Sequence, residues 1–372
     1  MKTLQVLLKP ASSACDIKCT YCFYRDEAAH RKTENAGYMK REVALAVIEK
    51  ALEFADTCTF AFQGGEPTLA GLDFYREFVE LVNTRKGREQ QIYYSIQTNA
   101  CRLDESWVGF LRENHFLVGV SLDGVRNTHD ANRKDSGGEG TFHSVFENVR
   151  KLQRMQVPFH VLCVLNRQTA ERAEAIYRFF CRKGFWYQQY IPCLDSIGDV
   201  RGEQEYSLGP KLYAQAMKKL FDLWFEDQRM GKPIYIRQFS NYLDILRGEQ
   251  PEACAMYGRC SLQNVIEADG SVYPCDFYAL DEYYMGNILE TDFARLREEA
   301  QEERPGSFFE SADRRDERCG RCRWYPLCRG GCRRDCVDEG ERRRNYYCEA
   351  YQEFFEYVVE RLEWLVSRMG KR

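Results

Sequence analysis

The chain has 372 residues, and its 44% hydrophobic and 30% charged residues are typical of a globular protein with one large domain and a smaller one. Its formal net charge of −4 argues against the strongly basic surface of a general nucleic-acid-binding protein. No apolar run approaches the roughly 18 residues that a membrane-spanning helix needs. The short apolar stretch near the N-terminus runs into Lys9 and Pro10, which predicts a buried strand rather than an export signal.

Apolar runs alternate with amphipathic stretches along the first 235 residues. The runs predict strands at residues 4–8, 59–63, 92–98, 116–122, 159–165 and 186–191. The amphipathic stretches predict helices at about 40–56, 72–86, 104–114, 141–156, 169–183 and 210–230, with Asp104 and Thr141 as two of the N-caps. Near-continuous apolar runs are typical of parallel strands that are buried on both faces. The pattern predicts an α/β fold, a partial (β/α)6 TIM-like barrel over residues 1–235, although an open doubly wound sheet fits the periodicity nearly as well.

Residues 236–372 have a different composition, in which Cys, Gly and Arg dominate. Such a segment buries little apolar surface by itself, so we expect a second domain that needs metal to fold. A closing amphipathic helix is predicted at about residues 347–369.

The chain contains 17 cysteines, most of them in one group near each end of the sequence. A secreted disulfide scaffold is usually shorter than about 100 residues and rich in loops, which this chain is not. Clustering at short spacings therefore predicts metal ligation in a reducing compartment, the cytoplasm.

The first group consists of Cys15, Cys19 and Cys22, with CxxxCxxC spacing, directly after the first predicted strand. A cubane cluster has four irons, so three thiolates leave one iron open for a substrate or cofactor. At the carboxyl end of a barrel strand, such a loop lies where these folds carry out chemistry. A zinc site with a distant fourth ligand is the alternative.

This motif and its position resemble those of the radical S-adenosylmethionine superfamily. The resemblance implies that the open iron of a 4Fe–4S cluster binds S-adenosylmethionine, whose reductive cleavage yields a 5′-deoxyadenosyl radical. Gly64, Gly65 and Glu66 follow the second predicted strand and match the family motif that contacts the methionine amino group; glycines permit such close approach. The other family positions that contact the cofactor are matched by Tyr21, Ser121, Arg133 and Leu194.

The second group contains Cys260 and Cys275, then Cys319-x2-Cys322-x5-Cys328-x3-Cys332, and after a gap Cys348. This pattern resembles the SPASM domain, which carries auxiliary clusters in radical enzymes that act on peptides. With Cys254 as an eighth ligand, the resemblance implies two further 4Fe–4S clusters and three in all. One would be held by Cys254, Cys260, Cys275 and Cys332, and the other by Cys319, Cys322, Cys328 and Cys348. A zinc ribbon formed by Cys319, Cys322, Cys328 and Cys332 is the alternative.

The remaining cysteines show no ligand spacing. Cys336 is left over beside Cys332, and we expect it at the surface. Free cysteine packs as a small hydrophobic residue, so we expect core positions for Cys58, Cys101, Cys163, Cys181 and Cys193.

The whole chain resembles anaerobic sulfatase-maturating enzymes. The resemblance lies in residues 9–24, 60–68, 121–124, 132–135 and 273–278. It implies oxidation of a cysteine or serine in a Cys/Ser-x-Pro-x-Arg segment of a sulfatase polypeptide to Cα-formylglycine. Asp276 matches the general base, and Tyr24 and Gln63 match positions that face the substrate. An electron donor such as flavodoxin or ferredoxin is expected as a partner, whereas nucleic acid and membrane are not.

Two other functions stay open at this point. Another SPASM peptide maturase, which forms a thioether or carbon–carbon cross-link or epimerises a residue, would carry the same cysteines. A zinc-binding adaptor without catalysis is the more remote alternative.

Overall fold

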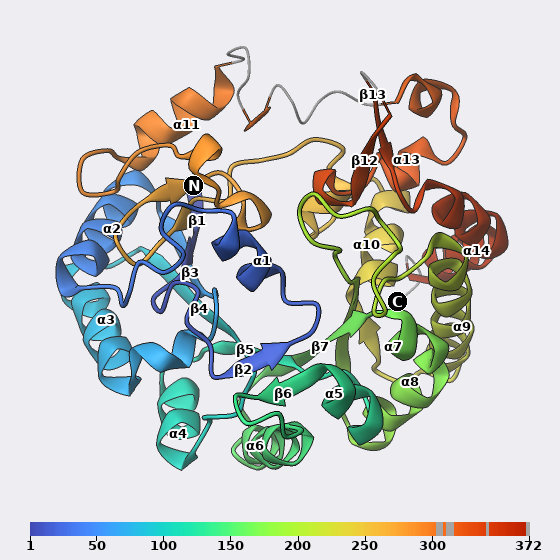
Figure 1. Cartoon of the computed structure of the whole chain (residues 1–372), viewed down its shortest axis with the longest axis horizontal. Coiled ribbons are helices and arrows are strands. Elements are labelled where there is room, and N and C mark those ends of the chain that lie inside the picture. Colours follow the sequence, from blue (N-terminus) through green and yellow to red (C-terminus); the bar gives the residue numbers. More distant parts are fainter. Residues whose placement is uncertain (303–307, 310–315, 340–341, 370–372) are drawn as a thin grey trace. The chain divides into compact units, whose positions relative to one another are not determined.

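The computed structural model describes residues 1–302, 308–309, 316–339 and 342–369 (Figure 1). They form two compact units. The first unit comprises residues 1–121, 130–159 and 261–308, and the second unit comprises residues 122–129, 160–260 and 309–372. Within the described residues no helix is both long enough and apolar enough to cross a membrane.

The first unit is built on a mostly parallel sheet. Its long strands pair in the order β1 (Thr3–Leu8), β3 (Thr57–Phe62), β4 (Gln91–Thr98) and β5 (Leu117–Ser121). On the other side of β1 lie β10 (Val265–Ile266), which is parallel to it, and β11 (Val272–Tyr273), which is antiparallel to β10. This sheet therefore joins segments from the beginning of the chain to segments that follow residue 260.

Helices of the first unit pack on its sheet through aromatic side chains. The ring of Phe78 in α3 lies 5.2 Å from that of Phe60 and 5.1 Å from that of Phe62, both in β3. This packing seats α3 on the sheet and fixes the turn that leads into it from β3. The helices of the unit are α1 (Phe23–Ala29), α2 (Arg41–Phe54), α3 (Leu72–Arg85), α4 (Glu105–Glu113), α6 (Phe142–Arg154) and α11 (Phe293–Gln301).

The second unit contains three parallel strands and the cysteine-rich end of the chain. The strands pair in the order β7 (Phe159–Leu165), β8 (Tyr187–Pro192) and β9 (Tyr235–Ile236). Its helices are α7 (Arg167–Glu171), α8 (Ala173–Arg182), α9 (Pro210–Arg229), α10 (Arg237–Leu246), α13 (Tyr325–Cys328) and α14 (Cys348–Met369). The short strands β12 (Cys336–Glu339) and β13 (Arg342–Asn345) pair in antiparallel orientation. Helix α5 (Arg126–Asn132) is divided between the units: its residues up to 129 belong to the second unit and the remainder to the first.

The closing helix α14 is held by aromatic packing. The ring of Phe354 lies 6.0 Å from that of Phe221 in α9 and 5.9 Å from that of Phe239 in α10. Phe354, Phe355, Val358 and Leu362 are all buried. The helix is thus fixed by its own apolar face.

The structure confirms the α/β class and all six predicted strands, each to within two residues. The predicted helix at 169–183 is two helices, α7 and α8, with a break at Arg172. Asp104 caps α4 as predicted, accepting a hydrogen bond of 2.9 Å from the Trp107 amide. Thr141 is the N-cap residue of α6, as predicted, but its side chain makes no capping hydrogen bond, and its hydroxyl donates to the Arg133 carbonyl at 3.0 Å. The division at residues 235 and 236 stays a prediction.

The five cysteines expected in the core divide into two sets. Cys58, Cys163 and Cys193 are buried, as predicted, whereas Cys101 and Cys181 are only half-buried. The leftover Cys336 is also half-buried, and its thiol donates to the Cys332 carbonyl at 3.4 Å.

Candidate active site

Three cysteines lie in one loop of the first unit, after β1. Within the loop, β2 (Ile17–Cys19) pairs antiparallel with β6 (Arg133–Asp135), and Cys19 is opposite Arg133. Cys19 is buried, and Cys15 and Cys22 are half-buried. Pairing with β6 therefore fixes the backbone of the loop that carries the three predicted ligands.

The environment of these thiols favours a bound cation. Burial, together with the nearby Glu66, Cys19 and Cys22, raises the pKa of Cys15 far above its ordinary value. A free thiolate is therefore disfavoured at Cys15, whereas ligation to a positively charged iron–sulfur core would compensate its charge. Among the described residues no set of three His, Cys, Asp or Glu side chains could hold a single metal ion. A cluster differs from a single ion in this respect, because each thiolate would bind a separate iron atom.

Two polar side chains approach the sulfur atoms. The Asn99 side-chain amide lies 3.8 Å from Cys15 Sγ, and Arg133 Nη1 lies 3.7 Å from Cys19 Sγ. Donors placed in this way stabilise thiolate ligands and tune a cluster. Sequence reasoning missed Asn99, although its position directly after a predicted strand was a usable signal.

The turn after β3 is pressed against the cysteine loop. The Gly65 amide donates to the Ser12 carbonyl at 2.9 Å, and the Glu66 amide donates to the Ala14 carbonyl at 2.7 Å. A Cβ atom on Gly65 would lie 2.1 Å from the carbonyl oxygen of Ala14. Glycine is therefore required by contact with the backbone next to Cys15.

Glu66 is fully buried, and both of its carboxylate oxygens are occupied. Oε1 accepts hydrogen bonds from the Thr68 hydroxyl at 2.6 Å and the Thr98 hydroxyl at 2.7 Å, and Oε2 accepts one from the Asn99 amide at 2.7 Å. Burial raises the pKa of Glu66 and these bonds oppose the rise. The side chain joins the ends of β3 and β4, a structural role that the sequence did not predict.

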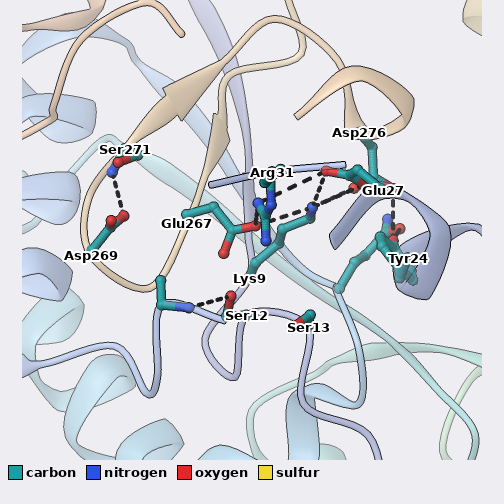
Figure 2. Close-up of polar contacts among 12 residues, drawn as sticks. Lys9, Ser12, Ser13, Tyr24, Glu27, Arg31, Glu267, Asp269, Ser271 and Asp276 are labelled. Carbon is teal, nitrogen blue, oxygen red and sulfur yellow. Dashed lines mark hydrogen bonds and ion pairs between the residues drawn. The ribbon is translucent and has the colours of Figure 1, made fainter. Parts of the chain in front are cut away.

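A buried group of charges lies beside this loop, as Figure 2 shows. Lys9, which follows β1, contacts three carboxylates: its Nζ lies 3.1 Å from Glu27, 3.3 Å from Glu267 and 3.9 Å from Asp276. Burial by itself would lower the pKa of Lys9, but these carboxylates outweigh it and raise that pKa. Arg31 neutralises Glu267 at 2.6 Å.

Asp276 is the carboxylate of this group that faces the predicted substrate-binding residues. It lies in the 3₁₀ turn η3 (Asp276–Tyr278) and is 8% exposed. Its Oδ2 accepts a hydrogen bond of 2.7 Å from the Tyr24 hydroxyl, which also lies 3.4 Å from Gln63 Oε1. Its buried Oδ1 has no hydrogen-bond partner among the described residues. The structure thus brings Asp276, Tyr24 and Gln63 together, and it places the second carboxylate oxygen of Asp276 beside Lys9.

Burial dominates the electrostatics of this aspartate. Burial raises the pKa of Asp276 above its ordinary value, while the Lys9 ammonium and the Tyr24 hydrogen bond oppose the rise. Burial and the adjacent Asp276 raise the pKa of Tyr24 well above its ordinary value, so the phenol keeps its proton and acts as the donor.

The other residues that match cofactor contacts are divided between the units. In the first unit, Ser121 ends β5 and accepts a hydrogen bond of 3.1 Å from the Gln97 amide. The ring of buried Tyr21 lies 5.6 Å from the Arg133 guanidinium. Leu194 follows β8 in the second unit.

The C-terminal cysteines are also divided. Cys275 belongs to the first unit, and the second unit contains Cys254, Cys260, Cys319, Cys322, Cys328, Cys332 and Cys348. Burial, with Cys348, Cys319 and Cys322 nearby, raises the pKa of Cys328 to about 12. These four residues are the ones that the resemblance assigns to one cluster. Cys254 is exposed.

Two family descriptions match the chain. The Radical SAM superfamily matches residues 10–180, and the iron–sulfur cluster-binding SPASM domain matches residues 254–323.

Relatives match it over its full length. A cysteine-type anaerobic sulfatase-maturating enzyme of Clostridium novyi is 44% identical and covers 100% of both chains. A serine-type anaerobic sulfatase-maturating enzyme of Bacteroides thetaiotaomicron is 28% identical, over 99% of this chain and 92% of its own. The solved structure of native anSMEcpe with bound AdoMet and Cp18Cys peptide is 40% identical, with a TM-score of 0.92 over 99% of both chains.

The contact at Gly65 gives a direct test of the loop. We expect Gly65→Ala to push Ala14 and Cys15 aside, to lower the free energy of unfolding by about 1–3 kcal/mol and to reduce bound iron by up to about four atoms per chain. Iron analysis after anaerobic reconstitution and denaturant unfolding would measure both effects. Gly109→Ala is the matched control, because a Cβ there meets nothing within 4 Å. Equal iron content in the two variants would contradict this account of the turn.

Proposed function

We propose that this chain, which belongs to the family of cysteine-type anaerobic sulfatase-maturating enzymes, oxidises a cysteine of a sulfatase polypeptide to Cα-formylglycine. Identity of 44% to a cysteine-type enzyme against 28% to a serine-type one supports cysteine as the substrate residue. The observation that carries the proposal is the Asp276 carboxylate, which is buried, accepts a hydrogen bond from Tyr24 at Oδ2 and has no hydrogen-bond partner at Oδ1 among the described residues.

The family fixes the cofactors, which are S-adenosylmethionine and 4Fe–4S clusters. When bound, they supply the radical that removes a hydrogen atom from the substrate and take up the departing electron. We assign Cys15, Cys19 and Cys22 to the cofactor-binding cluster, where the crowding of their thiols supports the assignment. The residues assigned to S-adenosylmethionine are Tyr21, Gly64, Gly65, Glu66, Ser121, Arg133 and Leu194.

Eight cysteines are assigned to two auxiliary clusters. One set is Cys254, Cys260, Cys275 and Cys332, and the other is Cys319, Cys322, Cys328 and Cys348. The second set is supported by the pKa of Cys328, which burial and the nearby thiols of Cys348, Cys319 and Cys322 raise.

The chain's own residues manage the substrate proton. Oxidation of a thiol to the thioaldehyde that precedes formylglycine releases the thiol proton, and the Asp276 carboxylate accepts it. The Tyr24 hydroxyl donates to Oδ2 and so fixes the orientation of the carboxylate. Gln63, which accepts a hydrogen bond of 3.4 Å from the same Tyr24 hydroxyl, is the second polar residue assigned to the substrate.

The sulfatase polypeptide is the macromolecular partner in this proposal. We also propose a small electron carrier, a flavodoxin or a ferredoxin, because cofactor cleavage consumes an electron. Oxygen-sensitive clusters and a thiol-rich sequence suit the cytoplasm of a cell that lives with little oxygen.

A peptide assay tests the proposal. The anaerobically reconstituted protein, given S-adenosylmethionine, a reductant and a Cys-x-Pro-x-Arg peptide, should form an aldehyde product that mass spectrometry detects. A cross-linked or epimerised peptide would instead place the chain among other peptide maturases, and an unchanged peptide would also count against the proposal.

The role of Asp276 predicts a specific defect. We expect Asp276→Asn to keep cleaving S-adenosylmethionine but to form about 10²- to 10⁴-fold less aldehyde, because an amide cannot accept the thiol proton. Measuring 5′-deoxyadenosine and aldehyde in the same reaction separates the two events. Full product from this variant would remove Asp276 from the chemistry.

The assignment of auxiliary ligands predicts a difference between two C-terminal cysteines. We expect Cys328→Ala to lose about four irons per chain and Cys336→Ala to keep the full complement of about twelve, since only Cys328 is assigned to a cluster. Iron and sulfide analysis of the reconstituted proteins would measure this. Comparable iron loss in both variants would refute the grouping.

A further inference from the structure

The buried charges around Asp276 are more numerous than a single ion pair. Two cations, Lys9 and Arg31, face three carboxylates, Glu27, Glu267 and Asp276 (Figure 2). All five side chains are 11% exposed or less. Because buried charges are tolerated only when they are paired, each member of this group constrains the position of the others.

The two cations differ in what they contact. Lys9 Nζ lies within 4 Å of all three carboxylates, including Asp276 at 3.9 Å. Arg31 contacts Glu267 at 2.6 Å and Glu27 at 4.0 Å. Of the cations in the described structure, Lys9 is the one recorded in an ion pair with Asp276.

Lys9 is held in one position from several sides. Glu27 and Glu267 anchor its ammonium at 3.1 and 3.3 Å. A Cβ atom on Gly64 would lie 3.2 Å from its Cβ and Cγ, so the stem packs against the turn after β3. Its Nζ also lies 5.1 Å from the centroid of the Tyr24 ring, the side chain that hydrogen-bonds to Asp276.

The distance of 3.9 Å between Lys9 and Asp276 is informative. It is too long for a hydrogen bond, so Lys9 does not occupy the lone pairs of Oδ1. Attraction between opposite charges extends well beyond that distance in a buried site. Lys9 can therefore orient the carboxylate without competing with the substrate for it.

We propose that Lys9 is a positioning residue for the reaction: its ammonium, anchored by Glu27 and Glu267, lies beside Oδ1 of Asp276 and holds this carboxylate in the orientation in which it receives the proton of the substrate thiol. This inference rests on the proposed function, since it gives Lys9 its role through Asp276. The competing explanation is that Lys9 only balances the charge of Glu27 and Glu267 and thereby stabilises the fold.

A matched pair of variants separates the two explanations. Lys9→Met and Arg31→Met each remove one positive charge from the same buried group, but only Lys9 is paired with Asp276. We expect Lys9→Met to lower the amount of aldehyde formed per 5′-deoxyadenosine by about 10²-fold at saturating Cys-x-Pro-x-Arg peptide, with little change in the KM for the peptide. Arg31→Met should keep a ratio near that of the unmodified protein. An unchanged ratio in Lys9→Met, or the same loss in both variants, would overturn the inference.

A double variant guards against loss of folding. Lys9→Met combined with Glu27→Gln removes one charge of each sign, so the net charge of the buried group is that of the natural protein. If Lys9 positions Asp276, the double variant should bind iron normally and still show the low ratio. Recovery of the aldehyde would show that Lys9 served only to balance Glu27, and would overturn the inference.

The unmodified protein, run in parallel, distinguishes failure of the inference from failure of the proposed function. If it forms no aldehyde, the proposed function fails. If it forms aldehyde and Lys9→Met matches its ratio, the proposed function stands and the role of Lys9 is refuted.

Discussion

The arrangement of the first unit depends on the need to neutralise charges that are out of contact with water. Lys9 comes from the beginning of the chain and Glu267 and Asp276 from its last third, yet their side chains meet inside the protein. An unpaired ammonium or carboxylate in that position would carry a large desolvation cost. The pairing therefore favours the conformation in which β10 lies beside β1 and the turn η3 contacts α1. The ion pairs of Lys9 with Glu267 and Asp276 thus help to place the segment that carries Asp276, and the same ion pairs belong to the candidate active site.

Much of this fold was predictable because its long strands have a simple signature. The runs at 59–63 and 159–165 have apolar centres, Phe60–Phe62 and Val161–Leu165, which lie in parallel pairing and are largely buried, so a local pattern sufficed. β10 and β11 have only two residues each, which is too short for any periodicity, and their positions depend on pairing with distant segments. The break at Arg172, where φ is −110° and ψ is 16°, separates two helices that both contact α9, and the apolar periodicity continues across it.

The site shows the same division between local and long-range information. The close approach of the Gly64–Gly65 turn was foreseeable, because paired glycines after a strand allow backbone contact. The saturated hydrogen bonding of Glu66 was not, since its partners Thr98 and Asn99 lie on another strand. Lys9 appeared in the sequence only as a residue after an apolar run, and its three partners became apparent only in three dimensions. Roles that depend on local chain geometry were thus accessible from sequence, and roles that depend on tertiary charge pairing were not.

Helix α14 carries one of the assigned cluster ligands, Cys348, as its first residue, while its apolar face is packed against α9 and α10 further along. The Cys348 sulfur therefore lies at the N-terminal end of a helix whose position is set by contacts further along its length. Oxidative loss of a cluster bound there would free the first turn of α14 and leave its packing against α9 and α10 intact. A scaffold of this kind keeps its ligand within reach of new iron and sulfide, so the metal centre can be rebuilt without refolding the polypeptide.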